Sequence, residues 1–438
     1  MSGAGPPEVS GRTAAEQPTA RRARGLGSLV IDVSPLRQSR DFRLIWLSQL
    51  ASSGGRQIVT VAVPLQVYLL TRSSLAVGLV GLAQAVPIVL AGLYAGALAD
   101  RSDRRRMQLI SKTVVACGSV GLAVGAASGN APVVMVFGIV AVTAAAAAAD
   151  QTARAATIPR LVPRELLASA VSVGQLLQQT GAVAGPAVAG LVIATAGLRW
   201  AYAIDALLFL PAAALVWLLS PQPPLEDHAV SFGWRAPAEA IGYVARRRLL
   251  VGLFSSDLVA MIFGMPTAVF PALALGVLRV GAGGLGLLYA APAAGALVGS
   301  LLSGWVRHVR RQGVAVFSAI AIWGAAIAGF GLAGRTLWLA LPLLAVAGAG
   351  DLVSTVFRNT ILQLSIPDSM RGRMSAFHMM VVTTGPRLGD LEAGSVATLA
   401  GPSFSVVSGG IACVVGIAVL AVLLPELRRW RAPDAAST

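Results

Sequence analysis

Long apolar segments, most of roughly twenty residues or more, fill this sequence, and short polar breaks separate them. A helix of about 20 apolar residues crosses the ~30 Å hydrocarbon core of a bilayer. The composition agrees, because 12% of the residues are charged, whereas soluble domains have about 25%. We therefore expect an all-α membrane protein whose twelve transmembrane helices lie at 44–70, 75–99, 107–128, 131–152, 168–194, 200–219, 248–276, 283–306, 313–333, 336–364, 373–400 and 402–424.

Arginine is distributed unevenly among the loops between these segments. Most arginines lie in alternate loops or near the C-terminus, and the remaining loops hold little beyond Arg72, Arg199, Arg279 and Arg335. Cytoplasmic loops of membrane proteins carry an excess of Lys and Arg, so we expect a cell inner (plasma) membrane protein with both termini in the cytoplasm. This placement explains the net charge of +15 without a nucleic-acid partner.

Breaks in the apolar pattern suggest a division into halves. Residues 1–36 are rich in Gly, Ala, Pro and Arg, which is typical of a disordered cytoplasmic tail. The one long interior break contains an amphipathic stretch at 234–248. We expect two six-helix bundles at 37–220 and 248–425, with a cytoplasmic linker at 221–247 and a cytoplasmic tail at 426–438.

The two halves repeat a pattern of glycine, arginine and proline at one constant spacing along the chain. The matched pairs are Gly181 with Gly385, Gly185 with Gly389, Gly190 with Gly394, Arg154 with Arg358, and Pro163 with Pro367. Six spans per half bring the second copy into the membrane from the same side as the first. We therefore expect parallel repeats related by an axis along the membrane normal.

The loop between the second and third spans combines an acid with several basic residues, namely Gly96, Asp100, Arg101, Arg104 and Arg105. Basic residues alone would serve as a topology signal. The matching loop of the second half keeps a glycine and arginines but has His308 where the acid would stand. Asp100 thus belongs to one copy only, and we expect it to form a charge clasp with a cation or a helix N-terminus nearby.

The loop pattern of Gly96, Asp100, Arg101, Arg104 and Arg105 resembles a signature of the major facilitator superfamily, and the resemblance to that superfamily extends over residues 40–430. The resemblance implies a secondary transporter that works by alternating access, and it places Arg154 and Arg358 in charge networks near the hinge of each half. Asp150 lies four residues before Arg154, so an ordinary ion pair within one helix is the alternative. The expected clasp comprises Gly96, Asp100, Arg101, Arg104, Arg105, Asp150, Arg154 and Arg358.

The fifth span carries Gly181, Gly185, Pro186 and Gly190. Small residues one turn apart allow close helix packing, and a proline bends the span. The pattern resembles the antiporter motif of proton-coupled drug exporters, which implies export in exchange for protons. An ordinary glycine-rich packing face is the alternative.

Four further segments are similar to the enterobactin exporter group of that superfamily, at 61–66, 270–274, 286–291 and 424–430. This resemblance implies efflux of a small molecule, a siderophore, driven by protons. A multidrug or macrolide exporter is one alternative, and a non-transporting membrane receptor or scaffold is another. The sequence shows no nucleophile–base pair, phosphate loop or metal cluster, so we expect no enzyme and no cofactor. We expect a monomer.

Polar residues inside membrane spans are costly and usually face a cavity or a partner. The candidates for a proton or substrate site are Arg56, Gln57, Asp257, Arg387, Asp390 and Glu392. We predict Asp257 and Asp390 as proton carriers, although each could instead form a structural salt bridge. Asp390 and Glu392 could instead serve only to neutralise the charge of Arg387. For Asp205, in the sixth span, we expect a structural role.

Overall fold

The computed structural model describes residues 32–129, 131–223 and 235–432, apart from the side chains of residues 93, 95–101, 235–237 and 307. Every regular element in these residues is helical. The long helices of the first half are α2 (Arg40–Thr71), α3 (Ser74–Arg101), α4 (Arg104–Ser128), α5 (Val133–Leu161), α6 (Leu167–Ala196) and α7 (Leu198–Trp217). Those of the second half are α9 (Arg248–Phe263), α11 (Gly281–Leu301), α12 (Gln312–Leu332), α13 (Leu337–Ser365), α14 (Arg371–Ala400) and α15 (Pro402–Leu423).

Ten segments within the described residues are long and apolar enough to cross a membrane. One of them runs from Arg248 to Val277, because α9 is continued by the short turns η3 (Thr267–Val269), α10 (Phe270–Ala272) and η4 (Leu273–Val277). The two other long helices, α2 and α14, have 32 and 30 residues. They are long enough to span but less apolar, since they hold the polar candidates Arg56, Gln57, Arg387, Asp390 and Glu392.

Two of the expected span limits are wrong. The fourth span does not end at 152, because α5 continues to Leu161 and carries Pro159 within its last turn. Asp150 and Arg154 therefore lie inside a helix rather than at its end. The eighth span is shorter than expected: α11 ends at Leu301, and the 3-10 turn η5 (Ser303–His308) follows.

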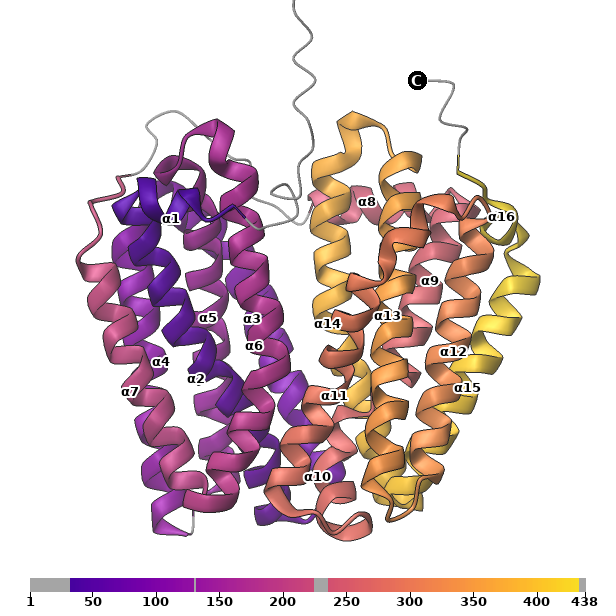
Figure 1. Ribbon diagram of the computed structural model, residues 1–438, viewed down its shortest axis with the longest axis horizontal. Coiled ribbons are helices and arrows are strands. Elements are labelled where there is room, and N and C mark those ends of the chain that lie inside the picture. The colour runs from indigo at the N-terminus through magenta and orange to yellow at the C-terminus, as the bar shows by residue number, and fades with distance from the viewer. Residues whose placement is uncertain (1–31, 130, 224–234, 433–438) are drawn as a thin grey trace, which may run out of the picture.

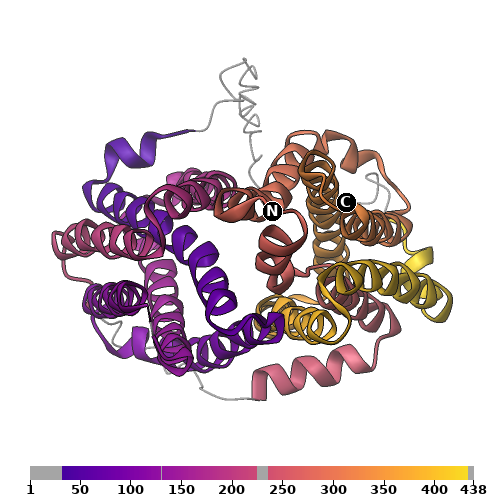
Figure 2. The same ribbon diagram turned by 90° about the horizontal axis from the view of Figure 1, so that it is seen from below.

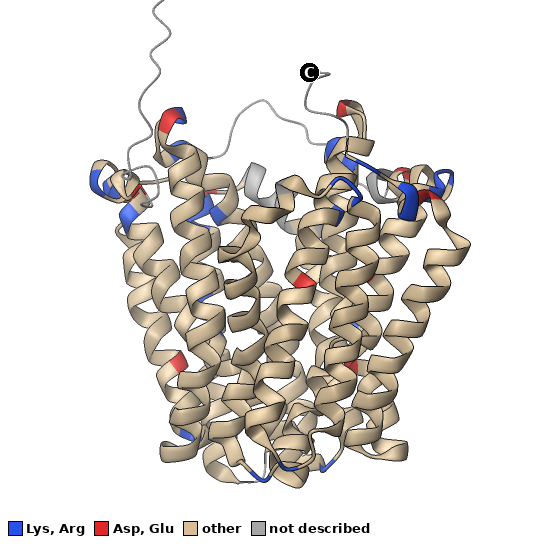
Figure 3. Cartoon of the chain, turned by 45° about the vertical axis from the view of Figure 1, so that its right-hand side comes forward, with Lys and Arg blue, Asp and Glu red and all other residues tan. Residues whose placement is uncertain are grey.

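The long helices form two bundles that stand side by side (Figures 1 and 2). The bundles lie apart at the end that carries α1 (Ser34–Gln38), α8 (Arg235–Ala245) and α16 (Pro425–Arg429). Charged residues gather at this same end (Figure 3), which we call the basic end. The division at 221–247 remains our proposal for the domain limits.

The short helices fall on segments that the sequence assigned to tails and linker. Residues 1–31 and 433–438 lie outside the described residues, but α1 begins at Ser34, so the last residues of the predicted N-terminal tail are helical. A capping bond from the Phe42 backbone N–H to the Ser39 side chain starts α2 directly afterwards. Helix α8 occupies the predicted linker, and α16 begins the predicted C-terminal tail.

Glycines join the two bundles at the end opposite the basic end. A Cβ on Gly190 of α6 would lie 2.7 Å from Cα of Gly286 on α11, and a Cβ on Gly394 of α14 would lie 2.5 Å from the carbonyl oxygen of Ser74 on α3. Gly190 and Gly394 are repeat partners, and each contacts the second long helix of the other bundle. The two close contacts therefore obey the parallel repeat.

The outer faces of both bundles are apolar. Leu399 and Trp338 of the second bundle are 88% and 82% exposed, and Val134 of the first bundle is 82% exposed. Large apolar side chains that are this exposed are suited to a hydrocarbon environment. The backbone polar groups behind them are already hydrogen-bonded within the helices, as a lipid environment requires. The lateral surface is therefore a lipid-facing surface.

Candidate functional site

A cavity of about 850 Å³ lies between the middle of the molecule and the basic end. Helices α2 to α7 of the first bundle form most of its wall. Helix α14 of the second bundle supplies Ala376, Met379, Met380 and Thr383. The volume falls in the range of small-molecule sites, about 300–1,000 Å³, and the wall is shared by both bundles.

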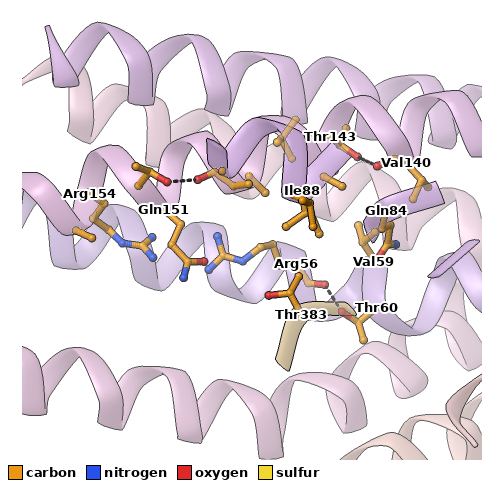
Figure 4. A pocket seen from close by; sticks show the side chains of 18 of the residues that line it. Arg56, Val59, Thr60, Gln84, Ile88, Val140, Thr143, Gln151, Arg154 and Thr383 are labelled. Atoms are coloured by element: carbon orange, nitrogen blue, oxygen red, sulfur yellow. Dashed lines mark hydrogen bonds between the residues drawn. The ribbon is translucent and has the colours of Figure 1, made fainter. Parts of the chain in front are cut away.

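One side of the cavity is polar and positively charged. Arg56 on α2 and Gln151 and Arg154 on α5 extend along it in a row (Figure 4). Thr60 lies one turn after Arg56 and donates a hydrogen bond of 2.9 Å to the Arg56 carbonyl oxygen. This side therefore offers amide and guanidinium donors to the cavity.

The rest of the wall is largely apolar or uncharged. The apolar lining residues are Val59, Ile88, Val89, Leu122, Val140 and Phe209, and the neutral polar ones are Gln84, Gln178, Thr143 and Thr152. A pocket with an apolar wall and a few convergent polar groups is the usual form of a small-molecule site. The cavity can accordingly hold an organic molecule with both polar and apolar parts.

A buried ion-pair cluster supports this wall from behind. Asp150 lies 3.2 Å (Oδ1) from Lys112 Nζ and 3.5 Å (Oδ2) from Arg154 Nη1, and all three side chains are buried. The four-residue spacing on α5 puts Asp150 and Arg154 on one helical face, and Lys112 reaches them from α4. Arg154 is thus both a member of the cluster and a cavity-lining residue.

Asp205 on α7 is the acid that lines the cavity among the described residues. Ser119 of α4 donates a hydrogen bond to Asp205 Oδ2, and Oδ1 has no hydrogen-bond partner in this part of the structure. Gly55 of α2 leaves room for the carboxylate, because a Cβ there would contact Asp205 Oδ1. Asp205 therefore has a free acceptor beside the cavity.

The second bundle contains a matching cluster of opposite charge balance. Arg358 on α13 pairs with Asp257 on α9, and both side chains are 5% exposed. Arg358 Nη2 also lies 3.9 Å from Asp351 Oδ1 and donates a hydrogen bond of 2.9 Å to Thr355 Oγ1. Arg358, the repeat partner of Arg154, is thus held by two carboxylates, whereas Arg154 shares one carboxylate with Lys112.

Asp390 lies in the contact between the bundles and not in the cavity. Its Oδ1 accepts hydrogen bonds from the Thr267 hydroxyl and, at 3.0 Å, from the Ala268 backbone N–H. Gly78 and Gly81 of α3 pack directly against this part of α14. Arg387 Nη1 lies 3.9 Å from Asp390 Oδ2, so the predicted pairing of these two residues is present.

The loop after α3 makes a backbone-directed network. Asp103 caps α4, accepting from the Arg105 backbone N–H at 2.8 Å. Arg104 is buried and donates a hydrogen bond of 3.2 Å to the Ala156 carbonyl oxygen of α5, and Arg105 donates to the Trp217 carbonyl oxygen. The side chains of Asp100 and Arg101 lie outside the described part of the structure, so the charge clasp of Gly96, Asp100 and Arg101 remains a prediction.

Several candidates occupy places other than the cavity wall. Gln57 packs under Gly185 of α6, and Asp257 pairs with Arg358. Arg387 and Asp390 are absent from the wall because their face of α14 turns toward α3 and η3, and Glu392 does not line the cavity either. Of the six candidates, Arg56 is the one that lines the cavity.

The antiporter-motif residues of α6 have separate contacts. Gly185 packs against Gln57 of α2. Gly190 and the carbonyl oxygen of Pro186 pack against Gly286 of α11. A Cβ on Gly181 would meet nothing within 4 Å. The motif therefore joins α6 to its own bundle at one point and to the other bundle at the next.

Two contributing residues were missed in the sequence. Lys112 completes the Asp150 cluster, and Thr267 holds Asp390. Lys112 was available as a signal, since it is a charged residue inside a predicted span at 107–128. Thr267 gave no comparable signal, because it is uncharged and lies far along the chain from Asp390.

The pattern that defines the transmembrane secretion effector family matches residues 31–438. The chain belongs to this family of major facilitator transporters. Its members are non-enzymatic. The enterobactin exporter EntS of Citrobacter koseri is 30% identical over 415 residues, covering 93% of this chain and 97% of that protein. EntS of Salmonella typhi is 28% identical over 413 residues, covering 92% and 97%.

Solved structures of the superfamily share the fold. A POT family transporter in complex with 5-aminolevulinic acid superposes with a TM-score of 0.71 at 12% identity, covering 89% of this chain and 97% of that one. The nucleoside transporter NupG gives a TM-score of 0.68 at 14% identity, covering 89% and 98%. The major facilitator fold expected from the sequence is therefore confirmed, and the protein is a multi-pass membrane transporter.

Proposed function

We propose that this family member exports a small organic molecule by alternating access, in exchange for protons. The observation that carries the proposal is a cavity whose wall is shared by both bundles, combined with glycine contacts that join the bundles at the other end. Rocking one bundle against the other would open that end and close the basic end around the same site.

We propose that the basic end faces the cytoplasm, together with both termini. The concentration of Lys and Arg at this end supports the orientation through the positive-inside rule (Figure 3). In this orientation the cavity receives its substrate from the cytoplasm, which is the loading step of an exporter.

Asp205 is the proton carrier that fits this scheme best. It reaches the cavity and has one oxygen without a hydrogen-bond partner among the described residues. The carriers favoured by the sequence are held elsewhere: Asp257 by Arg358, and Asp390 by Thr267 and Ala268. A carboxyl group that meets the cavity can exchange its proton when the cavity changes sides.

The proposed substrate is a siderophore of the enterobactin class. Support comes from the two EntS relatives, whose similarity covers over nine-tenths of both chains. The test compares metabolites in the iron-limited culture medium of wild-type and deletion cells of the source organism, with susceptibility to drugs and macrolides measured in parallel. Loss of a catechol-type metabolite from the medium supports the siderophore, whereas drug hypersensitivity with an unchanged medium favours the multidrug alternative.

A further inference from the structure

Arg56 is an unusual residue at the centre of the cavity. It sits in the middle of α2, and its guanidinium makes no ion pair within 4.0 Å with any residue that the structure describes. A cation at membrane depth is costly unless it meets a partner or a water-filled cavity, and a residue retained there is by default a functional-site candidate. The unpaired guanidinium therefore requires an explanation beyond packing.

The neighbouring charges leave Arg56 uncompensated. Around it stand Lys112, Asp150, Arg154 and Asp205, so three cations face two carboxylates. Asp150 is engaged by Lys112 and Arg154, and Asp205 accepts from Ser119. Among the side chains that the structure describes, one positive charge remains in excess beside the cavity.

The opposite wall provides no acid to balance that charge. Helix α14 contributes Ala376, Met379, Met380 and Thr383. Two flexible thioethers and a hydroxyl can contact an apolar body of variable shape, but they cannot neutralise a guanidinium. The complementary ligand therefore has a negative group at one end and an apolar body at the other.

We infer that the substrate is an amphipathic organic anion whose acidic group binds Arg56. The planar guanidinium offers paired N–H donors that match a carboxylate or a similar planar anion. Gln151 adds an amide beside it, in the same row of side chains (Figure 4). The apolar part of the ligand then packs on Val59, Ile88 and the two methionines of α14. This inference rests on the proposed transport function and specifies its substrate class.

The test uses a pair of probes that differ in charge but have nearly the same shape, 1-hydroxy-2-naphthoate and its uncharged amide. Their binding to the full-length protein in lipid nanodiscs is measured by titration calorimetry at neutral pH. The variants are Arg56→Gln, Arg56→Lys and the control Arg199→Gln. Arg199 is exposed at the start of α7, with its guanidinium carbon 5.6 Å from the Trp200 ring centroid, away from the cavity.

The wild type should bind the acid about tenfold or more tightly than the amide, as expected for a hydrogen bond to a charged group. Arg56→Gln should lose this preference while keeping its affinity for the amide, Arg56→Lys should keep part of it, and Arg199→Gln should match the wild type. Equal affinity of the wild type for both probes, binding of neither, or an unchanged acid preference in Arg56→Gln would overturn the inference.

Flux in proteoliposomes separates this inference from the proposed function. Acid-selective binding without flux of any probe would support the binding site and contradict the transporter. Equal flux of acid and amide, unaffected by Arg56→Gln, would contradict the anion site and leave the transporter in place.

Discussion

Two arginines related by the repeat, Arg154 and Arg358, sit in clusters with opposite excess charge. The first cluster has two cations around Asp150, and the second has two carboxylates around Arg358. Buried charges of this kind are tolerated because each finds a partner, and removing one partner leaves the other charge exposed to a low dielectric. The clusters therefore constrain which residues can change without unfolding a bundle.

Replacing Asp257 should destabilise the second bundle. Asp257→Asn leaves Asp351, 3.9 Å away, as the carboxylate still paired with Arg358, so we expect a loss of about 3–5 kcal/mol in the free energy of unfolding. Unfolding in mixed micelles of a mild detergent and dodecyl sulfate measures it. The control is Asp368→Asn, which removes an exposed pair with Arg371 at 3.0 Å and should cost about 0–1 kcal/mol. A similar small loss for both variants would contradict the role of the cluster.

Replacing Asp205 should uncouple transport from protons. Asp205→Asn retains the shape of the side chain beside Ser119 but cannot carry a proton. Substrate uptake into proteoliposomes should therefore no longer increase when a pH gradient is imposed, although exchange of substrate across the membrane should continue. The comparison uses proteoliposomes with and without the gradient. Asp390→Asn serves as the matched variant, because Asp390 lies outside the cavity wall. Loss of gradient-driven uptake in Asp390→Asn but not in Asp205→Asn would identify Asp390 as the carrier instead.

The sequence predicted some single-residue contacts and missed others for identifiable reasons. The Asp150–Arg154 pair follows from helical spacing alone, and a charge within a span suffices to suggest that Arg56 meets a cavity. The orientation of α14 is different, because its polar residues lie on more than one face. Without knowing which face meets α3, the sequence could not place Asp390 in the bundle contact.

Glycine controls how closely helices of different bundles approach. Gly190 of α6 meets Gly286 of α11, and Gly394 of α14 meets Ser74 of α3. These contacts explain a motif that the sequence could interpret only as a packing face or as an antiporter signature.

The span positions were predictable because the bilayer thickness fixes helix length, whereas the extension of α5 to Leu161 was not, since a proline is tolerated in its last turn.

Adding one methyl group to Gly190 should disrupt the contact between the bundles. In Gly190→Ala the new Cβ would stand 2.7 Å from the Ala282 carbonyl oxygen and from Cα of Gly286, so α6 and α11 must separate. We expect normal membrane insertion but at least a tenfold loss of transport, roughly what 1.4 kcal/mol of strain in one conformation produces. Gly181→Ala is the control on the same helix, because its Cβ would meet nothing within 4 Å. Equal transport by the two variants would contradict the role of Gly190 in the close contact between the bundles.

Alternating access requires the two ends of the molecule to open in turn. Two repeat-related pairs report on them: Arg164 with Asp368 at the tips of the basic end, and Thr195 with Leu399 near the opposite end. All four residues are exposed, so spin labels on introduced cysteines should leave the packing intact once Cys117 and Cys413 are replaced by serine.

The most direct test is pulsed electron spin resonance on these two labelled pairs in nanodiscs at neutral and at acidic pH. Alternating access predicts that the change in pH shifts the two distance distributions in opposite directions, one end closing as the other opens. A molecule in which both distances stay fixed, or lengthen and shorten together, would contradict alternating access by this chain.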